Sequence, residues 1–156
     1  MTLAIDQAAD PSLQDYLTVA LGDDLFAIKV DLVHEVLDPP PVTRVPNAPN
    51  FAPGLVNVRG NVLPLVDLRV RFGMEPTADT ASSRVIVSEV TREEGEPFQV
   101  AMRTDAVFEV IQVRRSDVAA MPENGSRWPM RFLDGVVRQD DRFVTLLDVS
   151  EVFRDA

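Results

Sequence analysis

Residues whose types could carry out chemistry are few in this sequence. There is one histidine, His34, and no cysteine, so the chain lacks the usual nitrogen and sulfur ligands of a zinc site. Two adjacent carboxylate pairs, Asp23-Asp24 and Asp140-Asp141, have the chemistry of an acid–base pair or of a hard-cation site. Both pairs fall in turns between apolar runs, where aspartate usually bonds to the local backbone. We therefore interpret them as turn residues and predict no catalytic centre, metal site or cofactor.

Arg59 is a more informative residue. It lies in GLVNVRGNVLPLVDLRVRFG, residues 54–73, where apolar alternation predicts two strands joined by a tight turn at Arg59-Gly60-Asn61. A guanidinium at a turn tip offers five donors in a planar group that suits carboxylates or carbonyls of a partner. The alternative interpretation is an arginine that is simply solvated.

Composition bounds the class of protein. The chain has 156 residues, of which 46% are hydrophobic, and a net charge of −10. This size gives one domain, or two small ones with a common core. The negative charge repels phosphate backbones and anionic lipids, so we expect neither a nucleic-acid partner nor direct membrane insertion. Residues 1–14 read as a flexible tail without a signal peptide, and we expect a cytoplasmic protein.

Periodicity predicts a mainly β chain with short helices. Helical spacing is limited to 30–37, 68–72 and 150–155, and 73–83 reads as a linker. The predicted strands and hairpins cover 15–21, 25–30, 42–46, 54–67, 84–90, 97–103, 107–113, 132–139 and 142–149. Short strands at this spacing favour barrels or a sandwich.

The sequence also contains an internal repeat. Residues 54–72 align without a gap on 135–153, at a shift of 81, and the segment from Asp31 aligns on that from Asp105 at a shift of 74. Phe26 aligns on Phe98 at a shift of 72. We interpret this as two similar β units, 15–72 and 84–156, which share an apolar seam because each is too small to bury a core alone.

The repeat separates structural positions from special ones. Arg59 aligns with Asp140, so the fold does not require an arginine at this turn, whereas Glu35 aligns with Glu109. His34 aligns with Phe108, which favours a packed or half-exposed histidine over a catalytic one.

Two further residues suggest surfaces. Pro64 cannot donate to a β ladder, so its strand should be bulged or form an edge at that point. Trp128 could anchor an interface, or it could cover the seam.

The run from 42 to 73 resembles the CheW-like domain of bacterial chemotaxis. Its marks are N-x-P-x-F-x-x-G, ending at Gly54, then N-x-R-G from Asn57, then PLVDLR from Pro64. The lead-in FAIKVDLVHEVL and the closing GVVRQDDRFVTLLDVSEVF also match the family, so the resemblance extends from about residue 15 to 153.

This resemblance implies a fold of two SH3-like five-stranded β-barrels that share a hydrophobic seam, with short helices. It implies a non-enzymatic adaptor that couples chemoreceptors to a CheA-type histidine kinase. The expected partners are the regulatory domain of that kinase and the cytoplasmic tip of chemoreceptors. The protein would then be recruited from the cytoplasm to receptor arrays by its partners.

The resemblance also assigns candidate site residues. For receptor binding they are Glu35 and Arg59, with the apolar groove residues Val33, Val36 and Val85 assigned by position. For kinase binding they are Gly54, Val56, Asn57 and Gly60.

Two alternatives are compatible with the sequence. The same fold could serve gliding or twitching motility, or another kinase pathway. A β-barrel that holds a small ligand in its seam is the second alternative, against which the scarcity of catalytic residue types argues.

Overall fold

The chain folds into two curled β-sheets. The structure is a computed structural model, and it describes residues 12–91, 95–121 and 128–154. The predicted tail 1–14 lies mostly outside these residues, although its last two residues already belong to the first strand. No helix within the described ranges is long and apolar enough to cross a membrane.

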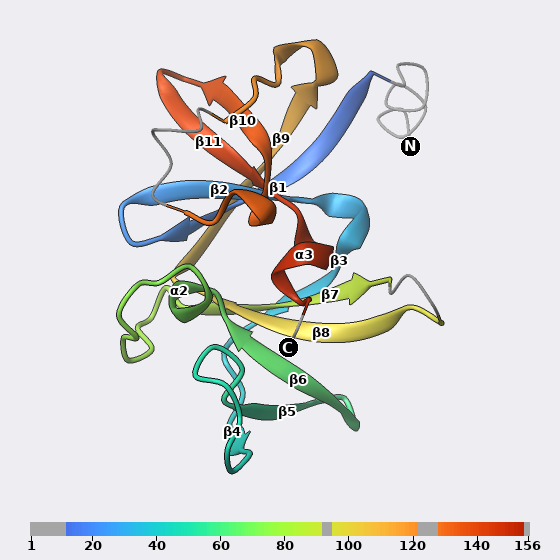
Figure 1. Ribbon diagram of the computed structural model, residues 1–156, viewed down its shortest axis with the longest axis vertical. Helices are drawn as coiled ribbons and strands as arrows, with labels where there is room; N and C mark the ends of the chain where they lie inside the picture. Colours follow the sequence, from blue (N-terminus) through green and yellow to red (C-terminus); the bar gives the residue numbers. More distant parts are fainter. Residues whose placement is uncertain (1–11, 92–94, 122–127, 155–156) are drawn as a thin grey trace.

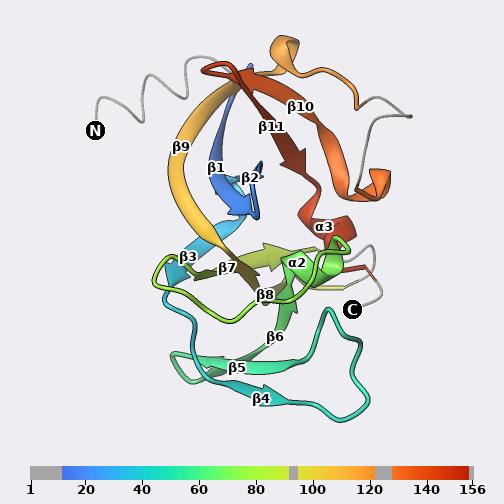
Figure 2. The same cartoon turned by 90° about the vertical axis from the view of Figure 1, so that its left-hand side faces the viewer.

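Barrel A is the five-stranded sheet, drawn in the upper part of Figures 1 and 2. Its strands follow the order β10-β11-β2-β1-β9. They are β1 (Leu13–Leu21), β2 (Asp24–Lys29), β9 (Ala106–Arg114), β10 (Leu133–Gln139) and β11 (Arg142–Leu147).

Barrel B is the six-stranded sheet in the lower part of the same views. Its order is β3-β7-β8-β6-β5-β4. Its strands are β3 (Val33–Leu37), β4 (Val42–Arg44), β5 (Gly54–Val58), β6 (Asn61–Asp67), β7 (Arg84–Val90) and β8 (Phe98–Thr104). The predicted mainly β fold with two barrels is confirmed.

Short helices lie between the barrels and at strand ends (Figure 2). Helices α2 (Leu68–Arg71) and α3 (Val149–Val152) are capped by the carboxylates of Asp67 and Asp148, as is usual at helix starts. The 3₁₀ turns are η1 (Val30–Leu32), η2 (Arg115–Asp117) and η3 (Met130–Phe132).

The predicted helix over 30–37 is wrong. Only η1 is helical, and Val33–Leu37 forms β3, which pairs antiparallel with β7. A register shift between Val33 and Glu35 places a bulge at His34. Because a bulge interrupts strict alternation, the apolar spacing of this strand imitates that of a helix.

The internal repeat is present, but its two copies exchange strands. β11 pairs in parallel with β2, so that Leu146 lies opposite Ala27, and β6 pairs in parallel with β8, so that Leu65 lies opposite Ala101. Since Leu65 and Leu146 are related by the shift of 81, Ala27 and Ala101 are equivalent. The shift here is 74, so the alignment of Phe26 on Phe98 is wrong by two residues.

This exchange overturns the predicted division into contiguous units 15–72 and 84–156. Barrel A joins β1 and β2 to β9, β10 and β11, while barrel B joins β3–β6 to β7 and β8. The sequence repeat identifies equivalent strands, but it carries no information about which copy supplies each pairing partner.

An apolar seam holds the barrels together, as predicted. Phe26 of β2 meets Phe72, which follows α2, with ring centroids 5.2 Å apart. Trp128 lies 5.7 Å from Phe26 and 6.0 Å from Phe72, so it covers the seam. The same cluster contains buried residues from both sheets, including Ile86 and Met102 of barrel B.

The segment 73–83 has no regular structure, and it is fixed to barrel B by Arg103. That side chain is buried in β8, and its Nε donates to Asp79 Oδ1 at 2.6 Å. Its Nη1 donates to Asp105 at 3.4 Å and lies 4.0 Å from Asp67. Burial raises the pKa of Asp67, an effect that the charge of Arg103 opposes. The segment 73–83 therefore packs on barrel B, where its Asp79 binds Arg103. It does not join two contiguous domains.

Candidate partner-binding surface

The β5–β6 hairpin ends in a two-residue turn. Val58 pairs with Asn61, which leaves Arg59 and Gly60 as the turn, with φ of 52° and 87°. Positive φ at both positions is typical of a type I′ turn, whose twist matches that of the strands. Asn57 Oδ1 accepts a hydrogen bond from Gly60 N at 2.9 Å. The N-x-R-G motif therefore builds the turn that presents Arg59.

Arg59 binds the carboxylate of Glu35 on β3. Its Nε donates to Oε1 at 3.0 Å and its Nη2 donates to Oε2 at 3.0 Å, so the pair is bidentate. β3 and β5 are far apart in the strand order of the sheet. The pair can form because the sheet curls and brings the hairpin tip to the β3 edge.

The pair is open to solvent and to partners. The side chain of Arg59 is 77% exposed and that of Glu35 is 27% exposed. The hydrogen bond from Arg59 lowers the pKa of Glu35. Nη1 of Arg59 donates to no described residue, and it is available to a carboxylate or carbonyl of a partner.

Burial divides the other candidate residues. Val36 is 39% exposed, Asn57 and Gly60 are exposed, and Val33 is half-buried against the seam. These four residues can contribute to a surface.

Two of the predicted contact residues belong to the core instead. Val56 and Val85 are each 1% exposed, and they lie in one apolar cluster inside barrel B. Neither side chain offers surface to a partner, so the prediction of Val85 as a receptor-groove residue and of Val56 as a kinase contact is wrong. Both point inward because alternate residues of a half-buried strand face the core.

Gly54 is also buried, and it has a steric role. A Cβ built at this position would lie 2.2 Å from the carbonyl oxygen of Thr43 in β4. Glycine therefore lets β4 approach β5 closely. Gly135 is its equivalent, where a Cβ would lie 2.8 Å from the carbonyl oxygen of Ala119. Both glycines serve barrel construction, and any effect of Gly54 on a partner acts through the position of β4.

Several exposed apolar residues were not predicted. In barrel B these are Val42, Val45 and Val62, with 42%, 41% and 62% exposure. Val62 lies directly opposite Asn57 in the hairpin. Outward alternation from the buried Leu63 could have identified Val62, whereas Val42 and Val45 required knowledge that β4 is an edge.

The strand with Pro64 behaves as predicted. On one side Pro64 lies opposite Leu55 of β5. On the other side, pairing of β6 with β8 begins only at Leu65. The missing N–H of proline thus falls where the strand is locally an edge.

Barrel A carries an equivalent but different surface. Its β10–β11 turn contains Asp140 and Asp141, with φ of 50° and 66°. Phe108, Val110 and Phe143 are 59%, 53% and 70% exposed. The two surfaces share a backbone and differ in charge and in aromatic content.

The fold defines a two-barrel protein, and barrel B exposes an ion pair with apolar residues beside it. In the described part of the chain, no group of three or more His, Cys, Asp or Glu residues could hold a metal ion. Residues 15–156 match the family model described as the CheW-like domain.

Relatives and a solved structure agree with that match. A probable chemotaxis protein CheW of Rhizobium etli is 30% identical over 91% of this chain and 88% of its own length. The chemotaxis protein CheW of Helicobacter pylori is 30% identical over 95% and 86%. The scaffolding protein TtCheW of Thermoanaerobacter tengcongensis superposes with a TM-score of 0.79 at 26% identity, covering 90% of this chain and 92% of that one.

The chain therefore belongs to the CheW-like family. Members of this family are non-enzymatic adaptors of chemotaxis signalling, and the prediction that the protein is not an enzyme is confirmed. The motility and ligand-barrel alternatives are not favoured.

Proposed function

We propose that the protein couples chemoreceptors to a CheA-type histidine kinase by binding both. The observation that carries this proposal is the ion pair of Arg59 and Glu35. Arg59 lies at an exposed hairpin tip and binds Glu35 of β3. The equivalent turn of barrel A contains Asp140 instead. An arginine that the fold does not need, held in one orientation, is suited to recognition.

The receptor would contact the tip and the adjoining β3. Arg59 and Glu35 supply donors and acceptors, and the exposed Val36 adds apolar surface beside them. Val33 continues this surface toward the seam. Such a mixture suits the cytoplasmic tip of a receptor helical hairpin, which would place apolar side chains on the valines and carboxylates or carbonyls on Arg59.

The regulatory domain of the kinase would contact the opposite edge of barrel B. All three residues of β4 are exposed, and within the described residues β4 has a strand partner only in β5. An open strand edge flanked by Val42 and Val45 is a natural docking surface for another β-barrel. Asn57 and Gly60 lie on the neighbouring hairpin, and Gly54 sets the position of β4.

Binding of this kind would place the protein in the cytoplasm, recruited to membrane receptor arrays through its partners. Contacts of the size of a hairpin tip and one strand edge are small. Their combined strength in an array would come from simultaneous binding to both partners.

The test is a binding assay of the purified full chain with the kinase and chemoreceptors of the same cell. Arg59→Glu should weaken receptor binding at least tenfold and leave kinase binding unchanged, because a like charge then faces Glu35 and the partner's carboxylates. Asp140→Arg, a charge reversal on the equivalent tip of barrel A, is the matched control and should leave receptor binding intact.

Two outcomes would reject the proposal. If the wild-type chain binds neither protein, the coupling function is wrong. If Arg59→Glu and Asp140→Arg weaken receptor binding equally, the tip of barrel B is not the recognition element.

A further inference from the structure

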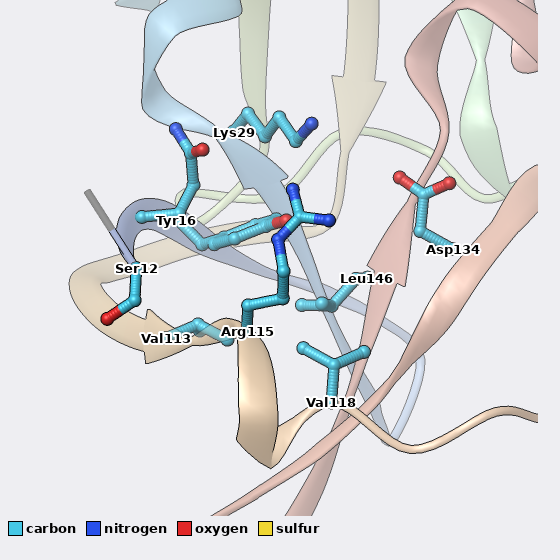
Figure 3. Close-up of a pocket in the computed structure, with 9 residues that line it drawn as sticks. Ser12, Tyr16, Lys29, Val113, Arg115, Val118, Asp134 and Leu146 are labelled. Atoms are coloured by element: carbon cyan, nitrogen blue, oxygen red, sulfur yellow. The ribbon is translucent and has the colours of Figure 1, made fainter.

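Barrel A contains a cavity that the proposed coupling function does not use. Its volume is about 320 Å³, which is at the lower end for small-molecule sites. It lies inside barrel A rather than in the seam, and its floor is apolar, formed by Val113, Val118 and Leu146. Polar side chains surround this floor; they are Ser12, Gln14, Tyr16, Lys29, Arg115 and Asp134 (Figure 3).

Charged groups of both signs line the cavity. Figure 3 shows the guanidinium of Arg115 beside the Tyr16 hydroxyl, with Lys29 above it and Asp134 to its right. Among the described residues, Lys29, Arg115 and Asp134 form no ion pair or side-chain hydrogen bond with one another or with another side chain. Each comes from a different element, so the backbone holds them apart across the cavity.

The internal repeat shows what fills the equivalent position in barrel B. The register of the parallel strand pairs makes Ala27 equivalent to Ala101, and Lys29 is therefore equivalent to Arg103. Arg103 binds the carboxylate of Asp79, which the segment 73–83 delivers at 2.6 Å. Lys29 has no such carboxylate in the described part of the chain. Two of the three carboxylates around Arg103, Asp67 and Asp105, have the counterparts Asp148 and Asp31, and within the described residues only the position of Asp79 has no counterpart.

Asp134 contributes a negative charge at the exposed rim of the cavity. It lies in the bulge between Leu133 and Gly135, and bulges commonly redirect a side chain. Burial raises the pKa of Asp134 and the charge of Asp148 raises it further, while Lys29 lowers it. A ligand ammonium next to Asp134 would stabilise its charged form. A plain carboxylate would be repelled at that side of the cavity.

We propose that this cavity binds a small zwitterion of the α-amino acid class with an aliphatic side chain. Its carboxylate lies between Lys29 and Arg115, its ammonium group faces Asp134, and its side chain rests on the floor of Val118 and Leu146. This site is separate from the partner-binding surface of barrel B and does not depend on the proposed coupling function.

The experiment is a titration of the isotope-labelled full chain followed by amide NMR. The probes are leucine and two analogues that each lack one charged group. 4-Methylpentanoate lacks the ammonium group, and 3-methylbutylamine lacks the carboxylate. Leucine should shift the amide signals of Tyr16, Lys29 and Gly135. It should also bind about tenfold more tightly than either analogue, since each analogue lacks one charged contact. Arg115→Gln and Lys29→Gln should each weaken leucine binding about tenfold. Arg138→Gln, an exposed arginine of β10 that does not line the cavity, is the matched control and should have no effect.

Asp134→Asn sharpens the assignment of the ammonium. It should reduce the affinity for leucine to that for 4-methylpentanoate. The proposal is overturned if leucine shifts none of the three amides, or if Arg115→Gln and Lys29→Gln leave its affinity unchanged. It is also overturned if 4-methylpentanoate binds as tightly as leucine.

Discussion

Barrels A and B are built from the same repeat, and they differ in how each treats equivalent positions. The two glycines that each face a neighbouring backbone carbonyl, Gly54 and Gly135, and the two capping aspartates, Asp67 and Asp148, are the same in both barrels. Arg59 and Asp140 at the hairpin tips are opposite in charge. The shared glycines and aspartates build the backbone, whereas the divergent residues at the two hairpin tips meet the surroundings.

The same contrast exists inside the barrels. Arg103 is buried among three carboxylates, of which Asp79 comes from the 73–83 segment, whereas Lys29 faces an open cavity. In barrel B, Arg103 is paired with protein carboxylates. In barrel A, Lys29 lines a cavity where it can contact a ligand. The following predictions test this contrast, beginning with the largest expected effect.

Arg103→Met should destabilise the protein by about 3–5 kcal/mol, because removal of one partner leaves buried carboxylates uncompensated. Lys29→Met at the equivalent position should change stability by less than about 0.5 kcal/mol. Urea unfolding of the two variants measures both effects. Equal losses would show that the two cations have the same structural role.

Gly54→Ala and Gly135→Ala should each cost about 2–3 kcal/mol, because the added methyl group meets a backbone carbonyl that cannot move aside easily. Gly60→Ala is the control. Its φ is +87° but nothing lies near a Cβ there, so it should cost only about 1 kcal/mol. Denaturant midpoints give the comparison, and an unaffected Gly135→Ala would break the equivalence of the two glycines.

Arg59→Ala should leave the free energy of unfolding within about 0.5 kcal/mol of wild type, since exposed ion pairs contribute little. Asp140→Ala should behave in the same way. Calorimetry on both variants tests whether the side chains at the two hairpin tips contribute to the stability of the fold. A drop in Tm of more than about 4 °C for Arg59→Ala, beyond the shift expected from 1 kcal/mol for a chain of this size, would mean that closure of barrel B depends on the ion pair.

The smallest predicted effect is one of pH. The lowered pKa of Glu35 means that its charged form stabilises the fold above the unfolded-state pKa of about 4.3, and that this contribution is lost as pH falls through the folded-state value. The Tm difference between wild type and Glu35→Gln should therefore be greatest near neutral pH and vanish in acid. In an Arg59→Gln background the difference should be constant with pH.

Local features of this molecule could be predicted from sequence because they depend on nearby residues. The turn at Arg59-Gly60 and the short helices after Asp67 and Asp148 follow from turn chemistry and apolar pattern. For Trp128 the sequence allowed both an interface and a seam position. The strand at Val33–Leu37 could not, because the bulge at His34 disguises its period. The burial of Val85 also escaped prediction, since it depends on which neighbours the curled sheet brings around it.

The pairing between strands that are distant in the chain could not be predicted from the sequence. The family resemblance assigned Glu35 and Arg59 to receptor binding, but it did not predict their ion pair, which requires the curl of barrel B. The cavity beside Lys29 gave no sequence signal, because its lining comes from five separate segments. The register of the parallel strand pairs makes Lys29 equivalent to Arg103, and this equivalence identifies Lys29 as a cation at the cavity.

The exchange of strands between the copies has a consequence for synthesis of the chain on the ribosome. β1 and β2 emerge first, yet their neighbours β9 and β11 emerge last. Barrel B, whose strands are consecutive from β3 to β8, can close while barrel A is still incomplete, because domains generally fold as units during synthesis. The first hairpin must then wait with unpaired edges until almost the whole chain has been made. We expect nascent chains that end before β9 to depend on chaperones, and full-length refolding to be limited by closure of barrel A, whose contacts span the greatest sequence separation.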